Sequence, residues 1–407
     1  MSHETSGFHL HVTSSAAVLL AVAIACFAAA APPAQAQVFT TIHTFTGGAD
    51  GYEPDVGFNM DHAGNLYGTA VYGGHKTCFG PGCGTVYKLE RKGSSWVVVP
   101  LYEFNGPDGE YPETRVIFGP DGNLYGTTQR GGDFDNGVVF RLQPLPAACK
   151  AVLCPWTETV IHSFAGGSDG EQPTYGDLLF DQAGNIYGTT PAGGNGSGCQ
   201  GGCGVVYELS PSNGGWTEKI LYNFQGGSDG ASPYAGVVLD NAGNLYGTAA
   251  FAGIGAGVVY ELTPSEGSWT QHIIYTFTDE SDGGEPYGGL IFDASGNLYG
   301  ATVFGTVYEL TPNGGGWTFN LLYTFQNVYE GSFAAMTFDS AGNLIGTLAI
   351  ADVEVFRLTP SNGQWILTGF SGSVGSVPTG NVILDAAGNL YTTTSEFGAG
   401  YAFEISP

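Results

Sequence analysis

After its N-terminal segment, the chain consists of short apolar runs rich in Val, Ile, Tyr, Phe and Thr, separated by Gly, Asn, Pro and Ser. Such runs between turn-forming residues predict β-strands, and we find no helical spacing of apolar positions beyond the N-terminus. Several runs, such as Val-Val-Tyr at 258–260, are apolar without strict alternation. This pattern is typical of strands that are covered on both faces. The hydrophobic pattern therefore predicts an all-β protein whose sheets pack face to face.

The runs recur in a fixed order, which makes the chain a tandem repeat. The phrase Gly-Asn-(Leu/Ile)-(Tyr/Ile)-(Gly/Thr) occurs seven times, beginning at Gly64, Gly122, Gly184, Gly243, Gly296, Gly342 and Gly388. A short apolar run precedes each copy, and a Gly-(Thr/Val)-Val-(Tyr/Phe)-x-Leu run or a weaker version of it follows. A run that begins with Trp completes six of the units. Each unit therefore contains four predicted strands, which we number first to fourth in chain order.

Seven units of four short strands predict a seven-bladed β-propeller over residues 37–407. The last unit stops after its third strand, at 400–405, and contains no Trp-led run. A run that resembles the end of a fourth strand, Thr-Thr-Ile-His-Thr-Phe at 41–46, precedes the first unit instead. We expect this N-terminal strand to complete the last blade and close the ring, because closure removes open sheet edges that favour aggregation.

Residues 1–36 have the features of a signal peptide. Their apolar, Ala-rich stretch at 16–31 is too short to span a membrane, and an Ala-Gln-Ala cleavage pattern follows at 34–36. We expect cleavage before Gln37, and the alternative is lipoprotein processing at Cys26. The mature chain is expected to be a monomer without a membrane span, either secreted or at the cell surface.

The cysteines beyond the predicted signal peptide lie in three close pairs. An even number at short spacing in an exported chain predicts disulfides. The expected disulfides are Cys78–Cys83, Cys149–Cys154 and Cys199–Cys203. The alternative is a zinc site with His75 beside the first pair. We favour disulfides, because zinc would need further ligands and the first and third units are not neighbours.

The chain carries a formal net charge of −27 and only ten Lys and Arg residues. This charge excludes general binding to the phosphate backbone of nucleic acids and disfavours anionic membrane surfaces. The sequence contains no nucleophile elbow, no His-Glu-x-x-His motif and no phosphate-binding loop. We therefore assign no catalytic residues.

Antiparallel connection places alternate loops of a blade on the same rim. One rim, here called the variable rim, carries the loops between second and third strands, such as 72–83 and 191–203, and the phrases between units. Those phrases repeat an Asp-Gly pair with Pro four residues after the Asp, at Asp50, Asp108, Asp169, Asp229 and Asp282. A ring of these carboxylates is a candidate Ca²⁺ site, and Ca²⁺ is the one candidate cofactor. We favour the alternative that each Asp stabilises its own turn through backbone hydrogen bonds.

Other polar and aromatic residues follow the scaffold. Each Trp is expected to pack in its blade, with an exposed sugar-stacking platform as the alternative. His43 and His162 occupy a position that is Tyr in four other units. Acidic residues on the variable rim are candidates for a hydrolase or lyase site. They are Glu53, Glu110, Glu113, Glu171 and Glu285. A single active site would be expected to break the repeat, whereas these acids recur with it.

The repeated phrases resemble those of the GloVer tandem-repeat family of exported bacterial proteins. The resemblance extends over residues 37–407 and is carried by GNLYGTT at 122–128, GNIYGTT at 184–190 and FQGGSDGASP at 224–233. It implies a secreted or surface propeller and carries over no catalytic residue. We expect a non-enzymatic binding module for a glycan or another extracellular protein on the variable rim. The alternatives are a polysaccharide hydrolase or lyase that uses rim carboxylates, and a structural protein of the cell envelope.

Overall fold

A computed structural model describes most of the chain beyond residue 36. The described residues are 37–145, 156–252, 255–278, 281–325, 336–350, 353–370, 377–378, 380–396 and 399–406. Residues Val38–Ser406 form one compact unit. Apart from one short 3₁₀ turn, η1 (Gly167–Asp169), the regular elements of the described residues are β-strands. The predicted signal peptide and both alternatives for its processing lie outside these residues.

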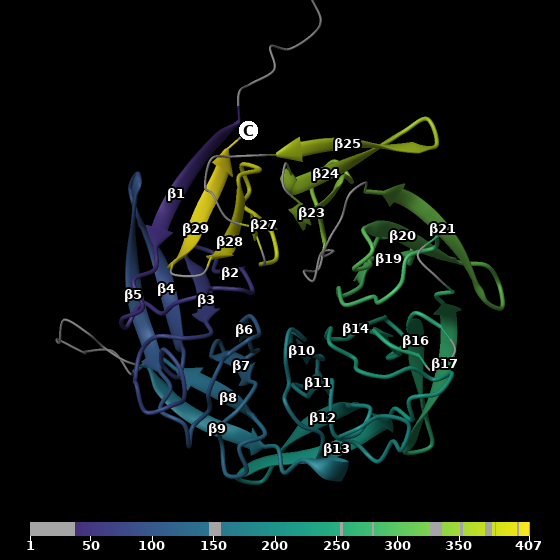
Figure 1. The fold of residues 1–407 in the computed structure, drawn as a ribbon, viewed down its shortest axis with the longest axis horizontal. Coiled ribbons are helices and arrows are strands. Elements are labelled where there is room, and N and C mark those ends of the chain that lie inside the picture. The colour runs from purple at the N-terminus through teal and green to yellow at the C-terminus, as the bar shows by residue number, and fades with distance from the viewer. Residues whose placement is uncertain are drawn as a thin grey trace, which may run out of the picture. The chain divides into compact units, whose positions relative to one another are not determined.

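The strands form seven antiparallel sheets, arranged as a seven-bladed β-propeller (Figure 1). Blade 1 contains β2 (Asn59–Met60), β3 (Leu66–Ala70), β4 (Thr85–Lys92) and β5 (Ser95–Glu103). Blade 2 contains β6 (Ile117–Phe118), β7 (Leu124–Thr128), β8 (Val138–Gln143) and β9 (Thr157–Ser163). Blade 3 contains β10 (Leu179–Phe180), β11 (Ile186–Thr190), β12 (Val205–Ser212) and β13 (Gly215–Asn223).

The next three blades repeat the same order. Blade 4 contains β14 (Val238–Leu239), β15 (Leu245–Ala249), β16 (Val258–Ser265) and β17 (Ser268–Thr276). Blade 5 contains β18 (Ile291–Phe292), β19 (Leu298–Ala301), β20 (Thr306–Pro312) and β21 (Trp317–Thr324). Blade 6 contains β22 (Thr337–Phe338), β23 (Leu344–Ile350), β24 (Val353–Ser361) and β25 (Gln364–Phe370).

The two ends of the chain share blade 7. This sheet contains β26 (Val377–Pro378), β27 (Ile383–Leu384), β28 (Leu390–Glu396), β29 (Ala399–Ser406) and, as its outermost strand, β1 (Val38–Thr44). Strand β1 pairs antiparallel with β29 through six residue pairs, and Figure 1 shows the purple β1 beside the yellow β29. The predicted closure by the N-terminal strand is therefore confirmed, although the strand ends at Thr44 and not at the end of the run 41–46.

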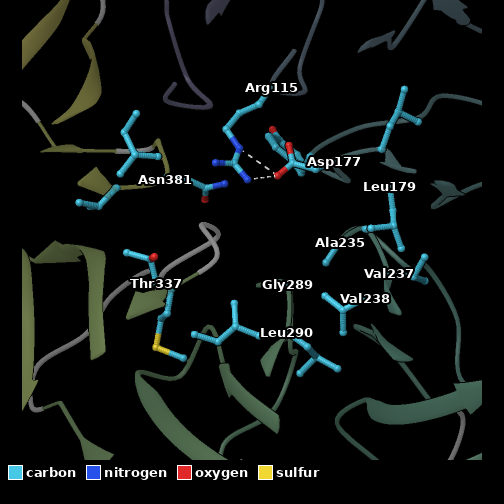
Figure 2. A pocket seen from close by; sticks show the side chains of 17 residues that line it. Arg115, Asp177, Leu179, Ala235, Val237, Val238, Gly289, Leu290, Thr337 and Asn381 are labelled. Carbon is cyan, nitrogen blue, oxygen red and sulfur yellow. Dashed lines mark hydrogen bonds and ion pairs between the residues drawn. The ribbon is translucent and has the colours of Figure 1, made fainter. Parts of the chain in front are cut away.

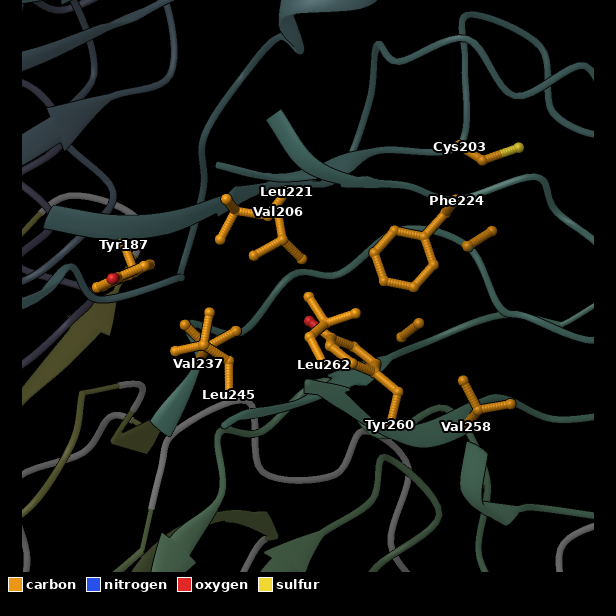
Figure 3. Packing of buried hydrophobic residues seen from close by; sticks show 12 residues of the cluster. Tyr187, Cys203, Val206, Leu221, Phe224, Val237, Leu245, Val258, Tyr260 and Leu262 are labelled. Carbon is orange, nitrogen blue, oxygen red and sulfur yellow. The ribbon is translucent and has the colours of Figure 1, made fainter. Parts of the chain in front are cut away.

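The hydrophobic core lies between neighbouring blades. In the cluster of Figure 3, Val206 and Phe224 of blade 3 pack with Leu245 and Tyr260 of blade 4, and all four are fully buried. This arrangement covers the central strands on both faces, as their continuous apolar runs indicated. The Trp residues contribute to the same contacts, since the ring of Trp216 lies 6.3 Å from that of Tyr125 in the preceding blade.

The Gly of the repeated Leu-Tyr-Gly-Thr phrase makes room for an aromatic ring in the third strand. Gly247 on β15 stands opposite Tyr260 on β16. A Cβ atom at Gly247 would lie only 2.4 Å from the Tyr260 hydroxyl oxygen. The same close approach occurs at Gly188 with Tyr207 and at Gly300 with Tyr308. This packing explains why Gly recurs inside a strand, where it is otherwise unfavourable.

The Asp-x-x-Gly-Asn turn is stabilised by its own Asp. Asp240 Oδ1 accepts hydrogen bonds from the backbone N–H groups of Ala242 and Asn244, both at 2.8 Å. Its Oδ2 accepts from the Asn244 side chain at 2.9 Å and from the Tyr246 hydroxyl at 3.1 Å. In the second unit, where Gly119 replaces the Asp, Asp121 accepts the equivalent hydrogen bonds from the backbone and side chain of Asn123 and from the Tyr125 hydroxyl. These bonds explain why the spacing of Asp, Gly and Asn recurs in the copies of the phrase.

Candidate binding site at the channel mouth

On the variable rim, the phrases between units lie beside the loops between second and third strands, as antiparallel connection requires. Isolated bridges join each of four inter-unit phrases to the loop between the second and third strands of the same blade. The bridges are Tyr52↔Tyr72, Glu110↔Arg130, Glu171↔Ala192 and Ala231↔Phe251. The two kinds of loop therefore lie side by side, as the sequence predicted.

The five inter-unit phrases that contain the Pro are also anchored to the preceding blade of the ring. A Cβ atom on Gly204 would lie 2.6 Å from Cδ of Pro233, so the Pro packs directly on the backbone of blade 3. The residue before the Pro, Ser232, has φ of 54° and donates its backbone N–H to the Cys203 carbonyl at 2.8 Å. Residues equivalent to Ser232 have φ values in the same left-handed region, at Glu53, Tyr111, Gln172 and Glu285. This backbone conformation is uncommon outside Gly, and its repetition indicates a fixed geometry for the residue that follows the Pro.

The position directly after the Pro differs between blades. It is Asp55 in blade 1, Glu113 in blade 2, Thr174 in blade 3, Tyr234 in blade 4 and Tyr287 in blade 5. Two neighbouring blades thus carry a carboxyl group where two others carry an aromatic ring. This is one of the positions at which the rim departs from its own repeat.

The two carboxyl groups have unusual environments. Burial raises the pKa of Asp55 to about 7, against the effect of a hydrogen bond with Ser395 and with a smaller contribution from the charge of Glu53. Burial also raises the pKa of Glu113 to about 8, and the negative charge of Asp55 adds to the shift. Asp55 Oδ1 is buried and has no hydrogen-bond partner among the described residues. Glu113 accepts a hydrogen bond from the Gln129 side chain at 3.1 Å. Near neutral pH both groups therefore bind protons readily.

Aromatic side chains continue along the rim from these acids. We call this set the tyrosine arc, and it consists of Tyr52, Tyr72, Tyr111, Tyr175, Tyr234, Phe251 and Tyr287. Its most regular contact is between Tyr234 and Tyr287, whose rings stack at 4.7 Å with an interplanar angle of 20°. Tyr72 meets Tyr111 edge to face at 5.3 Å, and Tyr175 lies 6.4 Å from Tyr234. Tyr175 is 43% exposed and Phe251 39% exposed, so part of this aromatic surface faces solvent.

The arc meets a central cavity at Tyr175. The cavity has a volume of about 360 Å³ and is lined by residues of the innermost strands β10, β14, β18, β22 and β27 and the segments that lead into them. Figure 2 shows the mostly apolar wall, including Val238 and Leu290, and the one ion pair drawn in it, between Arg115 and Asp177. Arg115 Nε lies 2.9 Å from Asp177 Oδ2. The site thus combines a mostly apolar cavity, which Tyr175 lines, with the acidic and aromatic side chains of the rim near Tyr175.

Comparison with known proteins identifies the repeat. A family model described as Gloeobacter/Verrucomicrobia repeat matches residues 30–153 and 153–353. The chain belongs to this family. The resemblance inferred from the repeated phrases is therefore confirmed. None of the curated proteins matches the chain.

Solved structures similar to this member of the repeat family share its fold at low identity. One is the extracellular domain of the hybrid two-component system BT3049 from B. thetaiotaomicron, with a TM-score of 0.53 and 12% identity, covering 93% of this chain and 41% of the other. Another is PorZ of Porphyromonas gingivalis, described as a bacterial surface component of the type-IX secretion system, with a TM-score of 0.53 and 12% identity over 88% and 47% of the two chains. A third is a chain of the mitotic checkpoint complex, with a TM-score of 0.56 and 11% identity, and the match covers 100% of both chains. The repeat protein thus spans less than half the length of the first two.

The five candidate Ca²⁺ ligands lie in five different inter-unit turns, and each is engaged locally. Asp50 accepts a hydrogen bond from the Thr46 backbone at 2.9 Å, and Asp229 accepts one from the Gln225 backbone at 2.7 Å. Asp108, Asp169 and Asp282 accept equivalent backbone bonds. Within the described residues no group of three potential ligands combines any two of the five. These contacts agree with the turn interpretation, and Ca²⁺ binding stays a prediction.

Two predicted disulfides are present on the variable rim of this repeat protein. Cys78 is bonded to Cys83 and Cys199 to Cys203. Because the first pair is bonded, its sulfurs do not serve as the zinc ligands considered beside His75. The pair Cys149–Cys154 lies outside the described residues. Along the described part of the chain, no helix is both long and apolar enough to cross a membrane.

Of the five predicted rim glutamates, Glu113 is the one at the position after Pro. Burial raises the pKa of Glu53, and burial with the charge of Asp135 raises that of Glu110. Asp55 was not among the residues predicted from the sequence, although an alignment of the units on their Pro puts it at the same position as Glu113. The Arg115–Asp177 pair was not predicted either; its two residues stand where blades 1, 4 and 5 have Gly.

Proposed function

We propose that this repeat protein is an exported binding module that holds a glycan on the tyrosine arc, at the mouth of the central channel. The observation that carries the proposal is the stacked Tyr234–Tyr287 pair beside the exposed Tyr175. Tyr rings present a flat apolar face and a polar hydroxyl with little conformational freedom, which suits the alternating C–H and hydroxyl surface of a sugar ring. The two rim disulfides are typical of an oxidising compartment outside the cytoplasm and support export.

The two half-buried acids, Asp55 and Glu113, suit the same ligand class. A protonated carboxyl group both donates and accepts hydrogen bonds, as a sugar hydroxyl does. Because the pKa values of Asp55 and Glu113 are raised to about 7 and about 8, both groups offer this pairing near neutral pH. This combination of a few polar groups with an apolar surface is typical of small-ligand sites.

A second candidate function is a polysaccharide hydrolase or lyase. The raised pKa of Glu113, about 8, is the property expected of a general acid at neutral pH. Incubation with each polysaccharide of the melt screen described below, followed by chromatography of the products, separates this activity from binding. An enzyme would release products that Glu113→Gln abolishes, whereas a binding module leaves the polysaccharide intact.

A thermal-melt screen tests the proposal. The chain from residue 37 onward, with disulfides intact, is melted with and without Ca²⁺ and with soluble β-glucan, xylan, pectin, chitosan and starch. A ligand of the native state at 100 times its dissociation constant stabilises the fold by about 2.7 kcal/mol. We expect a shift with at least one polysaccharide. A Ca²⁺ shift that Asp229→Asn removes would support the Asp ring as a metal site. No shift with any polysaccharide would contradict glycan binding and favour a protein partner or a structural role.

The raised pKa of Asp55 predicts a pH dependence of stability. An acid whose pKa is higher in the folded state destabilises the fold progressively as pH rises from its unfolded value of 3.8 to its folded value of about 7. Asp55→Asn removes this ionisation, so its melting temperature should exceed that of the wild type above pH 7. The advantage should shrink toward pH 4. An advantage that does not change between pH 4 and pH 8 would contradict the assigned environment.

A further inference from the structure

A second cluster of polar side chains lies away from the channel mouth, at the junction of the outer strands of blades 2 and 3. His162 is on β9, Asp169 is in η1 and Glu218 is on β13. His162 Nε2 lies 3.4 Å from Asp169 Oδ1 and 3.4 Å from Glu218 Oε1. One ligand atom from each of the three residues lies within 4.8 Å of the other two. Two adjacent segments of the chain and the more distant β13 thus direct an imidazole and two carboxylates to one point.

Two of the three converging atoms are buried and have no hydrogen-bond partner among the described residues. The three side chains are only 17–18% exposed. His162 Nε2 and Glu218 Oε1 are among the buried atoms without a hydrogen-bond partner in the described part of the chain. Asp169 uses Oδ2 for its turn, accepting from the Ala165 backbone at 2.5 Å, and Oδ1 faces the histidine. Leaving buried polar atoms unpaired is unfavourable, so this point is suited to a further ligand.

The repeat provides an internal comparison, because the junctions whose inter-unit turns the structure describes present the same three positions. At the junction of blades 1 and 2 they are Tyr102, Asp108 and Glu158, and the Tyr hydroxyl donates to the Asp at 2.6 Å. Other junctions have the combinations Tyr222, Asp229 and Gln271; Tyr275, Asp282 and Phe319; and His43, Asp50 and Val98. Among these junctions, only that of blades 2 and 3 combines imidazole with two carboxylates. The scaffold does not require this combination, since the other junctions form without it.

The geometry points to a divalent transition-metal site, and we propose that His162, Asp169 and Glu218 bind Zn²⁺ or an ion of similar preference. Bonds of about 2.0–2.1 Å in tetrahedral geometry place neighbouring ligand atoms roughly 3.4 Å apart. Both measured distances from His162 Nε2 have this value. Calcium tolerates a similar separation but prefers oxygen ligands, whereas imidazole with carboxylates suits zinc. The ion would connect two blades and leave its fourth position to water.

Zinc titration of the chelator-treated chain from residue 37 onward tests this site. By calorimetry we expect one ion per chain, with a rise in melting temperature. His162→Tyr introduces the residue of the equivalent junctions, so it should fold while weakening zinc binding at least about 100-fold. Glu218→Gln should also weaken binding. His43→Tyr is the matched control, because its junction has Val98 in place of the glutamate, and it should bind zinc as the wild type does.

Cobalt provides a second measurement that does not depend on stability. The wild type should give the intense visible absorption of a tetrahedral Co²⁺ site, and folded His162→Tyr should not. The proposal would be overturned if the wild type binds no stoichiometric zinc, or if His162→Tyr retains wild-type affinity. Equal loss of binding in His43→Tyr and His162→Tyr would also overturn it, because the metal would then not depend on this junction.

Discussion

A chain that begins at Phe45, without β1, is expected to unfold at a clearly lower temperature than the chain that begins at Gln37. Strand β1 supplies the outermost strand of blade 7 and pairs with β29 from Val38↔Ser406 to Thr44↔Tyr401. Its Phe39 packs on the cluster between blades 6 and 7, and its Ile42 packs on the cluster between blades 7 and 1. Burial of two such side chains contributes roughly 3 kcal/mol, to which the lost strand pairing adds.

Removal of β1 also exposes an edge that the closed ring protects. Without it, β29 presents unpaired backbone groups, so the shortened chain should associate with itself more readily. A synthetic peptide of residues 37–46, added in excess, should restore part of the lost melting temperature. Size-exclusion chromatography and thermal melts of both chains check these outcomes. Equal melting temperatures would show that closure by the N-terminal strand does not stabilise the ring.

Gly247→Ala is expected to destabilise the protein by about 1–3 kcal/mol, the usual cost of overpacking a core. The added Cβ would lie 2.4 Å from the hydroxyl oxygen and 2.6 Å from Cζ of Tyr260, which is fully buried. Neither the strand backbone nor the ring can move without disturbing the contact between blades 3 and 4. Chemical denaturation with parallel thermal melts measures the change in unfolding free energy.

A matched substitution separates this contact from a general effect of replacing Gly. A Cβ atom at Gly215, which begins β13, meets no other atom within 4 Å. Gly215→Ala should therefore be nearly neutral. Tyr260→Phe removes the oxygen nearest to the new methyl group, so adding it to Gly247→Ala should recover part of the loss. If Gly247→Ala and Gly215→Ala cost the same, the packing explanation of the repeated phrase is wrong.

The architecture could be predicted because each unit repeats its own local chemistry. Seven copies of one phrase revealed the number of blades, and the absence of a final Trp strand, with Thr-Thr-Ile-His-Thr-Phe at the other end, revealed the closure. The placement of the variable loops and the inter-unit phrases on one rim followed from antiparallel connection alone. The two disulfides that the structure describes were predicted from the close spacing of their cysteines in the sequence. All of these features depend on residues near one another in sequence or on simple counting.

The candidate sites were harder to predict because they depend on where the repeat is broken and on contacts between blades. Asp55 carries no sequence motif, and its importance follows from burial and from its place after Pro. His162 was interpreted as a substitution at a scaffold position, which is correct for its backbone. Its proximity to Glu218 requires the pairing of neighbouring outer strands, which the sequence of one unit does not reveal. The chemistry of a repeat protein therefore has to be sought in differences between equivalent positions.

The most direct test of the binding site is a titration of the best polysaccharide from the melt screen against single variants of the rim. Tyr234→Ala should weaken binding about tenfold, equivalent to about 1.4 kcal/mol, because it removes one ring of the stacked pair. Phe79→Ala, which changes a 95% exposed ring on the same rim but outside the tyrosine arc, should bind as the wild type does. Unchanged affinity in folded Tyr234→Ala, or an equal loss in Phe79→Ala, would contradict a glycan site on the tyrosine arc.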